Sequence, residues 1–295
     1  MKSWRETQLV FEEIRRLAAA GRKAALATLT RVAGSSYRRP GAKLLIRDDG
    51  SMLGNVSGGC LEEDLRERAL KVIASGIPEL VHYETGSDDA VAWGLGLGCN
   101  GKLDLWLQPA PAEMADDILR RLDGKQPFEF RAGDFVETLA PPPDLVICGA
   151  GDDAVPLARL AAESGFRVTV IDHRKAYLRI AHCRLVHARP EDGFTADANT
   201  LVIIKYHALE FDRAWTQHFI KQSVRYIGLL GPKARRDEIL KSEISNLKSP
   251  LFAPIGLDLD AEGPEQIAVS IVAELLAVVA GRKPRHLRDR RENIH

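Results

Sequence analysis

Cys60 stands at the start of a predicted helix, behind two glycines and ahead of a run of acidic residues, in the segment NVSGGCLEEDL. Gly58 and Gly59 would let the backbone approach a ligand closely. The helix dipole at such a position lowers the pKa of a thiol, and Glu62 lies within reach as a base or a counter-charge. The segment therefore predicts a soft ligand or a sulfur-handling thiol, although Glu62 and its acidic neighbours would oppose thiolate formation.

Two further loops in the same half are rich in glycine. The first, VAGSSYRRPGAKLL, lies between two predicted strands and combines small residues with two arginines, a pattern typical of anion recognition but also common on protein surfaces. Its candidate ligand-binding residues are Gly34, Ser35, Ser36, Arg38 and Arg39. The second, WGLGLGCNGKLDL, places Cys99 and Asn100 among glycines just before a strand. We expect all three loops to share one cleft.

The second half contains GAGDDA between an apolar strand and a helix, which fits the pattern G-x-G-x-x-[GA]. Gly149 and Gly151 would permit a tight turn that brings a diphosphate against the helix N-terminus. Asp172 ends the next strand, 21 residues after Gly151, where an acidic residue would meet a ribose hydroxyl. Asp152 and Asp153 place negative charge where phosphate would lie. A ligand-binding turn and a turn without a ligand both remain open.

Composition narrows the class of protein. The chain has 295 residues, of which 45% are hydrophobic, enough for two domains. Lys plus Arg and Asp plus Glu number 41 each, so the basic excess of a nucleic-acid-binding protein is missing. No apolar stretch is long enough to span a bilayer and no signal-peptide pattern is present, so we expect a cytoplasmic protein without a membrane partner.

The cysteines are too few and too scattered for a disulfide framework or a paired zinc motif. Cys148 lies inside the apolar run LVICGAG, and Cys183 lies in AHCRLVHA. Free cysteines in such surroundings are usually buried packing residues. We therefore expect both to be reduced thiols without a chemical role.

The elements that must position these residues differ between the two halves. Apolar spacing predicts helices over residues 4–20 and 61–76, and the strands between them form a hairpin that turns at Asp49 and Gly50. In the second half, short β-branched runs alternate with helical segments. The fold class is therefore α/β: a mixed α+β domain followed by a Rossmann-like doubly wound parallel sheet with helices on both faces.

Proline-rich segments set the expected domain boundary near residue 141. Residues 1–141 form the N-terminal domain, and its last part, 109–141, includes a linker that contains one short amphipathic helix. Residues 142–295 form the Rossmann-like domain, which ends with a helix from about Pro264 to Ala280.

Six segments, in this order, resemble the XdhC/CoxI family: GSSYRRPGAKLL, SGGCLE, GLGLGCNG, GAGDDAVPLARLAAESGFRVTVIDHR, YIGLLGPKARR and PIGLDLDAEGPEQIAVSIVAELLAV. The family comprises maturation factors for molybdenum hydroxylases such as xanthine and carbon monoxide dehydrogenases. The resemblance implies a chaperone rather than a catalyst. Such a protein binds the molybdenum cofactor, supports its sulfuration by a cysteine desulfurase and delivers it to an apo molybdenum hydroxylase. It also implies a homodimer.

On this resemblance, Arg38 and Arg39 would hold the cofactor's phosphate, and Gly58 and Gly59 would admit the pterin. Cys60 would face the molybdenum or its incoming sulfide.

The segment IIKYHALEFD departs from the family pattern. It keeps His207 and Asp212 but has Lys205 and Tyr206 where many relatives carry a Thr-His pair, so ligand contacts of His207 stay open. Two alternatives remain. One is an NAD(P)-dependent oxidoreductase that uses GAGDDA and Asp172, with His207 as the proton donor. The other is an assembly scaffold that binds no cofactor.

Overall fold

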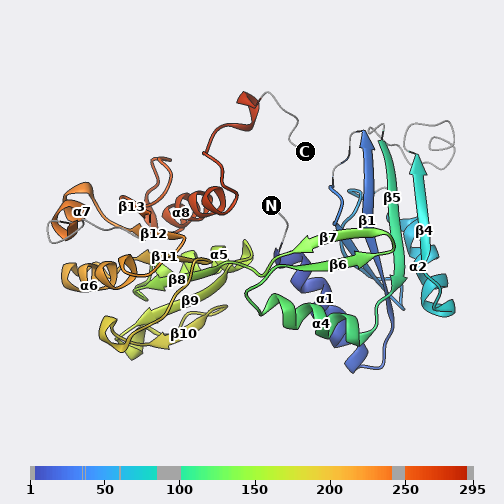
Figure 1. Ribbon diagram of the computed structural model, residues 1–295, viewed down its shortest axis with the longest axis horizontal. Helices are drawn as coiled ribbons and strands as arrows, with labels where there is room; N and C mark the ends of the chain where they lie inside the picture. Colours follow the sequence, from blue (N-terminus) through green and yellow to red (C-terminus); the bar gives the residue numbers. More distant parts are fainter. Residues whose placement is uncertain are drawn as a thin grey trace. The chain divides into compact units, whose positions relative to one another are not determined.

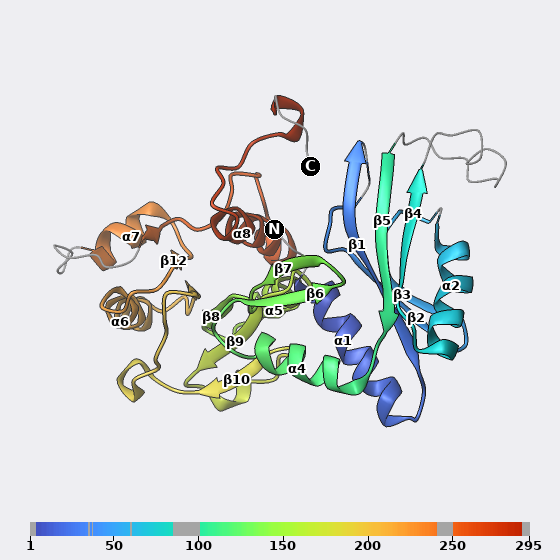
Figure 2. The same ribbon diagram turned by 45° about the vertical axis from the view of Figure 1, so that its right-hand side comes forward.

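The computed structural model of this chain describes residues 4–34, 36, 38–59, 61–84, 101–240 and 250–290. The chain forms two compact units that divide between Pro141 and Pro142. One unit is built on an antiparallel sheet and the other on a parallel sheet (Figures 1 and 2).

The first unit contains a five-stranded antiparallel sheet of order β3-β2-β1-β5-β4. Its elements are α1 (Trp4–Ala19), β1 (Ala24–Gly34), β2 (Lys43–Arg47), β3 (Met52–Gly54), α2 (Glu62–Ser75), β4 (Glu79–Glu84), β5 (Gly101–Pro109), α4 (Ala112–Leu122), β6 (Phe128–Ala132) and β7 (Phe135–Leu139). The predicted hairpin between β2 and β3 is confirmed. The predicted helix stop at Gly76 is also confirmed, because this residue caps α2 in the left-handed conformation with φ +73°.

Alternation of side chains along the central strand builds two cores, one on each face of the sheet. Leu26 of β1 packs in the core formed with α1, α4 and the β6–β7 hairpin. Its neighbours Ala25 and Ala27 point to the opposite face and pack in the core formed with α2. The sheet therefore has helices on both faces.

Residues 109–141 are more than a linker, which corrects the sequence-based expectation. The short helix predicted there is present as α4, but the segment also contains the antiparallel hairpin β6–β7. Ile118 of α4 and Phe130 of β6 are buried in the same core as Phe11 of α1. The segment therefore belongs to the folded body of the first unit.

The second unit is the predicted parallel sheet, with six strands in the order β10-β9-β8-β11-β12-β13. Its strands and α-helices are β8 (Asp144–Cys148), α5 (Ala154–Glu163), β9 (Arg167–Asp172), β10 (Arg184–His187), β11 (Thr200–Ile204), α6 (Leu209–Ile220), β12 (Tyr226–Leu229), α7 (Lys233–Leu240), β13 (Leu251–Phe252) and α8 (Gly263–Val279). Single 3-10 turns lie at Lys175–Tyr177, Pro190–Asp192 and Leu287–Asp289. The strand order reverses between β8 and β11, which is where α/β sheets of this kind hold their ligands.

Helices cover both faces of the parallel sheet, as predicted. Helices α5 and α8 pack with Leu145 and Ile147 of β8 on one face, whereas Trp215 of α6 packs with Val146 and Cys148 on the other. Cys148 is fully buried, as expected, and Cys183 is partly buried. Within the described residues, no helix combines the length and the apolar character needed to cross a bilayer.

Candidate functional site

Two of the glycine loops meet at the start of β2. The N–H of Asn55 donates to the carbonyl of Lys43 at 3.2 Å, so the chain after β3 runs beside the segment that leads into β2. Gly54 makes this approach possible, because it adopts φ +97° and a side chain there would collide with the Lys43 carbonyl. The proximity of these two loops is therefore built into the sheet.

The SGG turn uses its own backbone donors. The N–H of Gly58 donates to Asn55 Oδ1 at 2.9 Å, and the N–H of Gly59 donates to Ser57 Oγ at 3.4 Å. Both glycines have positive φ, +96° and +116°, which other residues rarely adopt. The structure thus explains the glycines by turn geometry, and their N–H groups are already engaged within the turn.

Glu62 turns back onto the same turn. Its Oε2 accepts hydrogen bonds from the N–H of Leu61 at 2.9 Å and from Ser57 Oγ at 2.7 Å. This carboxylate therefore stabilises the first turn of α2, where acidic groups are favoured by the helix dipole. Its Oε1 is buried and has no hydrogen-bond partner among the described residues. The predicted catalytic pairing of Glu62 with Cys60 involves a residue outside the described part of the chain.

Arg38 is engaged by the first helix. Its Nη2 lies 2.7 Å from Glu6 Oε1 and 2.5 Å from Glu6 Oε2, and both side chains are only about a quarter exposed. Ser36 Oγ accepts from the Arg38 N–H at 3.3 Å, which tightens the loop. Arg39 is exposed. A ligand phosphate would have to compete with Glu6 for Arg38, so the structure does not present Arg38 as a free anion-binding group.

Gly34, at the end of β1, pairs with Gly101 at the start of β5. The first and third glycine loops are therefore attached to the sheet at the same end. Four of the predicted site residues lie outside the described residues: Ser35, Cys60, Cys99 and Asn100.

In the second unit, Gly149 directly follows β8 at the point where the strand order reverses. Its φ is +109°, and a Cβ there would lie 2.7 Å from the carbonyl oxygen of Lys205 and 3.1 Å from the Cα of Tyr206. Glycine is required because the backbone after β11 passes directly against this turn. The residue serves the packing of the turn whether or not a ligand binds.

Lys205 fills the space beneath the glycine turn. Its ammonium group lies 2.6 Å from Asp153 Oδ1 and 3.4 Å from the carbonyl oxygen of Gly149, and its side chain is 1% exposed. Burial lowers the pKa of Lys205, and Asp153 only partly offsets this effect. His207 approaches the same carboxylate, with Nε2 3.0 Å from Asp153 Oδ2, and has a left-handed backbone with φ +58°. The structure therefore joins three polar groups where a dinucleotide phosphate would be expected.

Burial alone would raise the pKa of Asp153, but Lys205 and His207 outweigh that effect and lower it. Asp153 is therefore ionised and compensates the buried ammonium group of Lys205. The charges in the turn are balanced within the protein, so an added phosphate would find no spare cation in this cluster.

Asp172 is fully buried, contrary to the exposed position that ribose binding requires. Its Oδ2 accepts from the N–H of Ala150 at 2.8 Å, and the carboxylate also receives the guanidinium of Arg174 at 2.9 Å and 3.0 Å. Burial would raise the pKa of Asp172, but the hydrogen bonds from Arg174 and Ala150 lower it overall. Asp172 thus fastens the glycine turn to the end of β9.

Aromatic side chains occupy the neighbouring space at the ends of β9 and β11. The ring centroids of His173 and Phe211 are 4.2 Å apart with nearly parallel planes, and Tyr206 lies 5.2 Å from Phe211. In dinucleotide-binding folds the adenosine lies in this region, past the second strand. The protein's own side chains therefore pack where that part of a dinucleotide would be expected.

Sequence reasoning missed two features of these sites. Lys205 follows the fully buried strand run TLVII, and a lysine directly after a buried strand is a signal for a buried ion pair, here with Asp153. Arg31 in β1 carries no sequence signal, because its side-chain direction depends on an irregularity in the pairing of β1 with β5 between Leu29 and Arg31. Within the described ranges, no group of three or more histidine, cysteine or acidic side chains is placed to hold a metal.

Comparison with known proteins covers both units. Residues 17–84 match the XdhC and CoxI family, and residues 145–275 match the XdhC Rossmann domain. The chain is 30% identical over 307 residues to a Bacillus subtilis protein named as a probable xanthine dehydrogenase subunit, covering 86% of this chain and 92% of that protein. It is 26% identical over 287 residues to an Escherichia coli protein named molybdenum cofactor insertion chaperone PaoD, covering 88% and 84%.

A solved structure supports the same assignment. The crystal structure of a xanthine dehydrogenase from Bacillus halodurans matches with a TM-score of 0.80 and 30% sequence identity, over 93% of this chain and 96% of that chain. The matches extend across the antiparallel unit and the Rossmann unit in the order that the six sequence segments predict. The chain belongs to the XdhC/CoxI family.

Proposed function

We propose that this protein binds the molybdenum cofactor and inserts it into a molybdenum hydroxylase of the xanthine dehydrogenase type. The observation that carries this proposal is family membership over both units, together with a relative of similar length that is named a molybdenum cofactor insertion chaperone. The cofactor is then cargo that the chain holds and releases. A chaperone for such cargo needs a protected site and a surface for its client, but no turnover of its own.

The glycine loops of the first unit are the proposed cargo site. Two of them meet at the start of β2 through Asn55 and Lys43, and the first and third join the sheet at one end through Gly34 and Gly101. Cys60, next in the chain after the SGG turn, would supply a soft sulfur ligand, which suits molybdenum. Gly58 and Gly59 shape the turn, and Glu62 holds it to α2.

The sulfuration step and its partners belong to the same proposal. A cysteine desulfurase would supply sulfur to the cofactor while this chain shelters it, and an apo hydroxylase would then receive it. We also propose that the chain acts as a homodimer, on the strength of the family resemblance alone, and that it works in the cytoplasm, as its sequence pattern leads us to expect.

The geometry gives little support to a nicotinamide-dependent activity. The strand order and the glycine turn match dinucleotide-binding folds. However, Asp172 is buried against Ala150 and Arg174, and Lys205 neutralises Asp153 inside the turn. We expect titration with NADH or NADPH to leave tryptophan fluorescence unchanged. Saturable energy transfer to either nucleotide would favour the oxidoreductase instead.

Activation of an apo hydroxylase tests the proposed function. The full chain, purified from a host that makes the cofactor, is mixed with the apo enzyme, and recovered activity is measured. Cys60→Ala should reduce the recovered activity, whereas Cys183→Ala, a partly buried cysteine of the other unit, should not. If the wild-type chain recovers no activity, the insertion role is wrong. If Cys60→Ala performs as well as the wild type, Cys60 has no part in it.

A further inference from the structure

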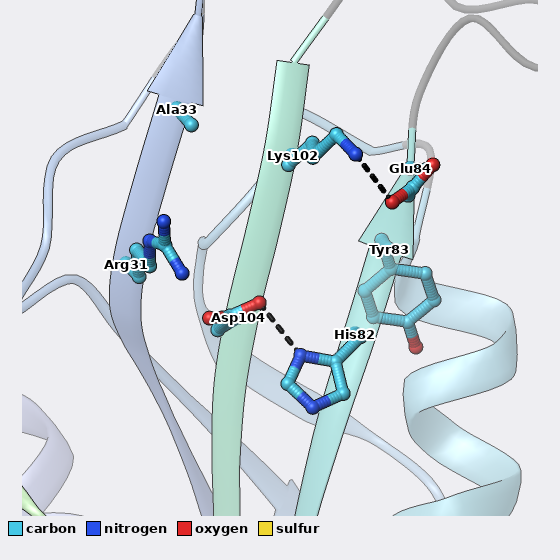
Figure 3. Close-up of a pocket in the computed structure, with 7 residues that line it drawn as sticks. All are labelled: Arg31, Ala33, His82, Tyr83, Glu84, Lys102 and Asp104. Carbon is cyan, nitrogen blue, oxygen red and sulfur yellow. Dashed lines mark hydrogen bonds and ion pairs between the residues drawn. The ribbon is translucent and has the colours of Figure 1, made fainter.

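A polar hollow of about 330 Å³ lies on the face of the antiparallel sheet opposite α2, at the end of the sheet where β4 stops and β5 begins (Figure 3). Three adjacent strands, β1, β5 and β4, form its floor. The residues that line it are Arg31, Ala33, His82, Tyr83, Glu84, Lys102 and Asp104. Most of these side chains are charged, which distinguishes the hollow from an apolar packing defect.

A bulge in β1 places Arg31 in this hollow. Leu29 pairs with Leu105 and Arg31 pairs with Asp104, so Thr30 is an extra residue in the ladder. Thr30 Oγ1 donates to the Asp104 carbonyl at 3.0 Å and so fastens the bulge. In regular alternation Arg31 would share the face of Leu29, which packs in the core beneath α2. The bulge turns Arg31 to the opposite face, beside Asp104, and bulges commonly redirect side chains next to functional sites.

The other charges in the hollow have partners. His82 Nδ1 lies 2.7 Å from Asp104 Oδ1, and Lys102 Nζ lies 2.6 Å from Glu84 Oε1 (Figure 3). In contrast, the exposed Arg31 has no hydrogen bond or ion pair with any other described residue. Each carboxylate is thus matched locally by a basic group, and the guanidinium of Arg31 is left to interact with a ligand.

These groups form a convergent set of donors. The Arg31 guanidinium offers a planar fork of N–H donors that matches two oxygens of one oxyanion. Lys102 keeps further N–H groups beyond the one directed at Glu84, and its ion pair is solvent-exposed, so it opens at little cost. His82 Nδ1 bonds to Asp104, so in the neutral imidazole Nε2 carries no N–H and His82 is not counted as a donor. A tetrahedral oxyanion has enough acceptor oxygens to reach Arg31 and Lys102 together.

We propose that this hollow binds a phosphate monoester through Arg31, with Lys102 as the supporting group. We identify this ester as the phosphate of the pterin cargo, an identification that rests on the proposed function. Arg31 is a better anchor for the phosphate than Arg38, because Glu6 already holds Arg38 whereas the carboxylates in the hollow are bonded to His82 and Lys102. It also places the anion on the same end of the sheet as Gly34 and Gly101, where two of the glycine loops are attached.

The test begins with cofactor-free full chain from a host that cannot make the cofactor. Glycerol 3-phosphate is titrated and its binding is measured by calorimetry, with glycerol as the uncharged comparison. Arg31→Gln should weaken binding about tenfold or more, because a bidentate charged contact is lost. Arg31→Lys keeps the charge without the fork and should fall between the two. Arg131→Gln changes an exposed arginine paired with Glu129 outside the hollow and should bind like the wild type.

The same variants are then purified from a cofactor-producing host, and bound pterin is measured by the fluorescence of its oxidised form. Loss of both phosphate ester and pterin in Arg31→Gln supports the proposal. Unchanged ester binding in Arg31→Gln, or no ester binding by the wild type, overturns it even if pterin is retained. If the wild type binds the ester through Arg31 but never carries pterin, the hollow stands as a phosphate site and the proposed function fails.

Discussion

Replacing Asp153 by Asn removes the charge that compensates the buried ammonium group of Lys205. The side chain of Lys205 is 1% exposed and that of Asp153 is 21% exposed, and their charged atoms are 2.6 Å apart. Removing one partner of a buried pair costs about 3–5 kcal/mol. Because Asp153 is partly solvated, we expect a cost at or just below the bottom of that range, about 2–3 kcal/mol at pH 7.

The cost of deprotonating Lys205 sets an upper limit on this loss of stability, and the expected loss of about 2–3 kcal/mol lies below that limit. Lys205 can avoid an uncompensated charge by losing its proton, which costs about 1.4 kcal/mol for each pH unit below the ordinary lysine pKa of about 10.4. At pH 7 this limit is about 5 kcal/mol. Lys205→Met should cost less than about 1 kcal/mol, because it removes the buried charge and leaves Asp153 bonded to His207.

The loss of stability in Asp153→Asn should become smaller as the pH rises. The pKa of Lys205 is already lowered by burial in the wild type, and loss of Asp153 lowers it further. The folded variant therefore binds fewer protons than the folded wild type in the window between these two pKa values. The stability difference between Asp153→Asn and the wild type is largest below this window and shrinks as the pH rises through it towards 10.

Urea unfolding followed by peptide-resolved hydrogen exchange measures this effect in the second unit alone, using strands β8 and β11. The double variant, Asp153→Asn with Lys205→Met, should be close in stability to Lys205→Met. If Asp153→Asn is within about 0.5 kcal/mol of the wild type at pH 7, or if its deficit stays constant up to pH 10, the buried pair does not have the energetic role argued from its geometry.

Two other predictions use the same unit. Gly149→Ala should destabilise it by about 3 kcal/mol or more, because the new Cβ would lie 2.7 Å from the Lys205 carbonyl at φ +109°. Gly193→Ala, at φ +76° with open space around it, should cost only about 1 kcal/mol. Urea titration compares the two variants, and equal losses of stability would contradict the close approach at Gly149. Cys148 should resist alkylation in the folded protein at pH 8, because burial raises the pKa of its thiol and excludes the reagent, and mass spectrometry should find it modified only after unfolding.

Patterns that depend on local spacing were read correctly from the sequence. The β-branched run that ends at Cys148, with a glycine turn and a helix after it, predicts a buried parallel strand, and β8 is one. Asp49 and Gly50 predict the β2–β3 hairpin for the same local reason. The alternating residues of FEFRAGDFVETL also carried a signal for the β6–β7 hairpin, but the surrounding prolines directed the interpretation towards a linker.

Side-chain partners could not be predicted in the same way. The position of Asp172 at the end of β9 follows from spacing, but its burial depends on Arg174 and on the N–H of Ala150 in the glycine turn after β8. The same holds for Arg38, whose partner Glu6 is 32 residues earlier in the chain. Arg31 depends on a register shift between β1 and β5, which is a property of the pair of strands and not of either sequence alone.

The proposed role requires this chain to carry molybdenum cofactor. This requirement is tested by metal analysis of the full chain, purified from a cofactor-producing host, with molybdenum and oxidised pterin measured per chain in one preparation. We predict that the two are present in equal amounts and are both reduced in Cys60→Ala. Molybdenum and pterin at no more than the level of an unrelated protein purified in parallel would contradict the claim.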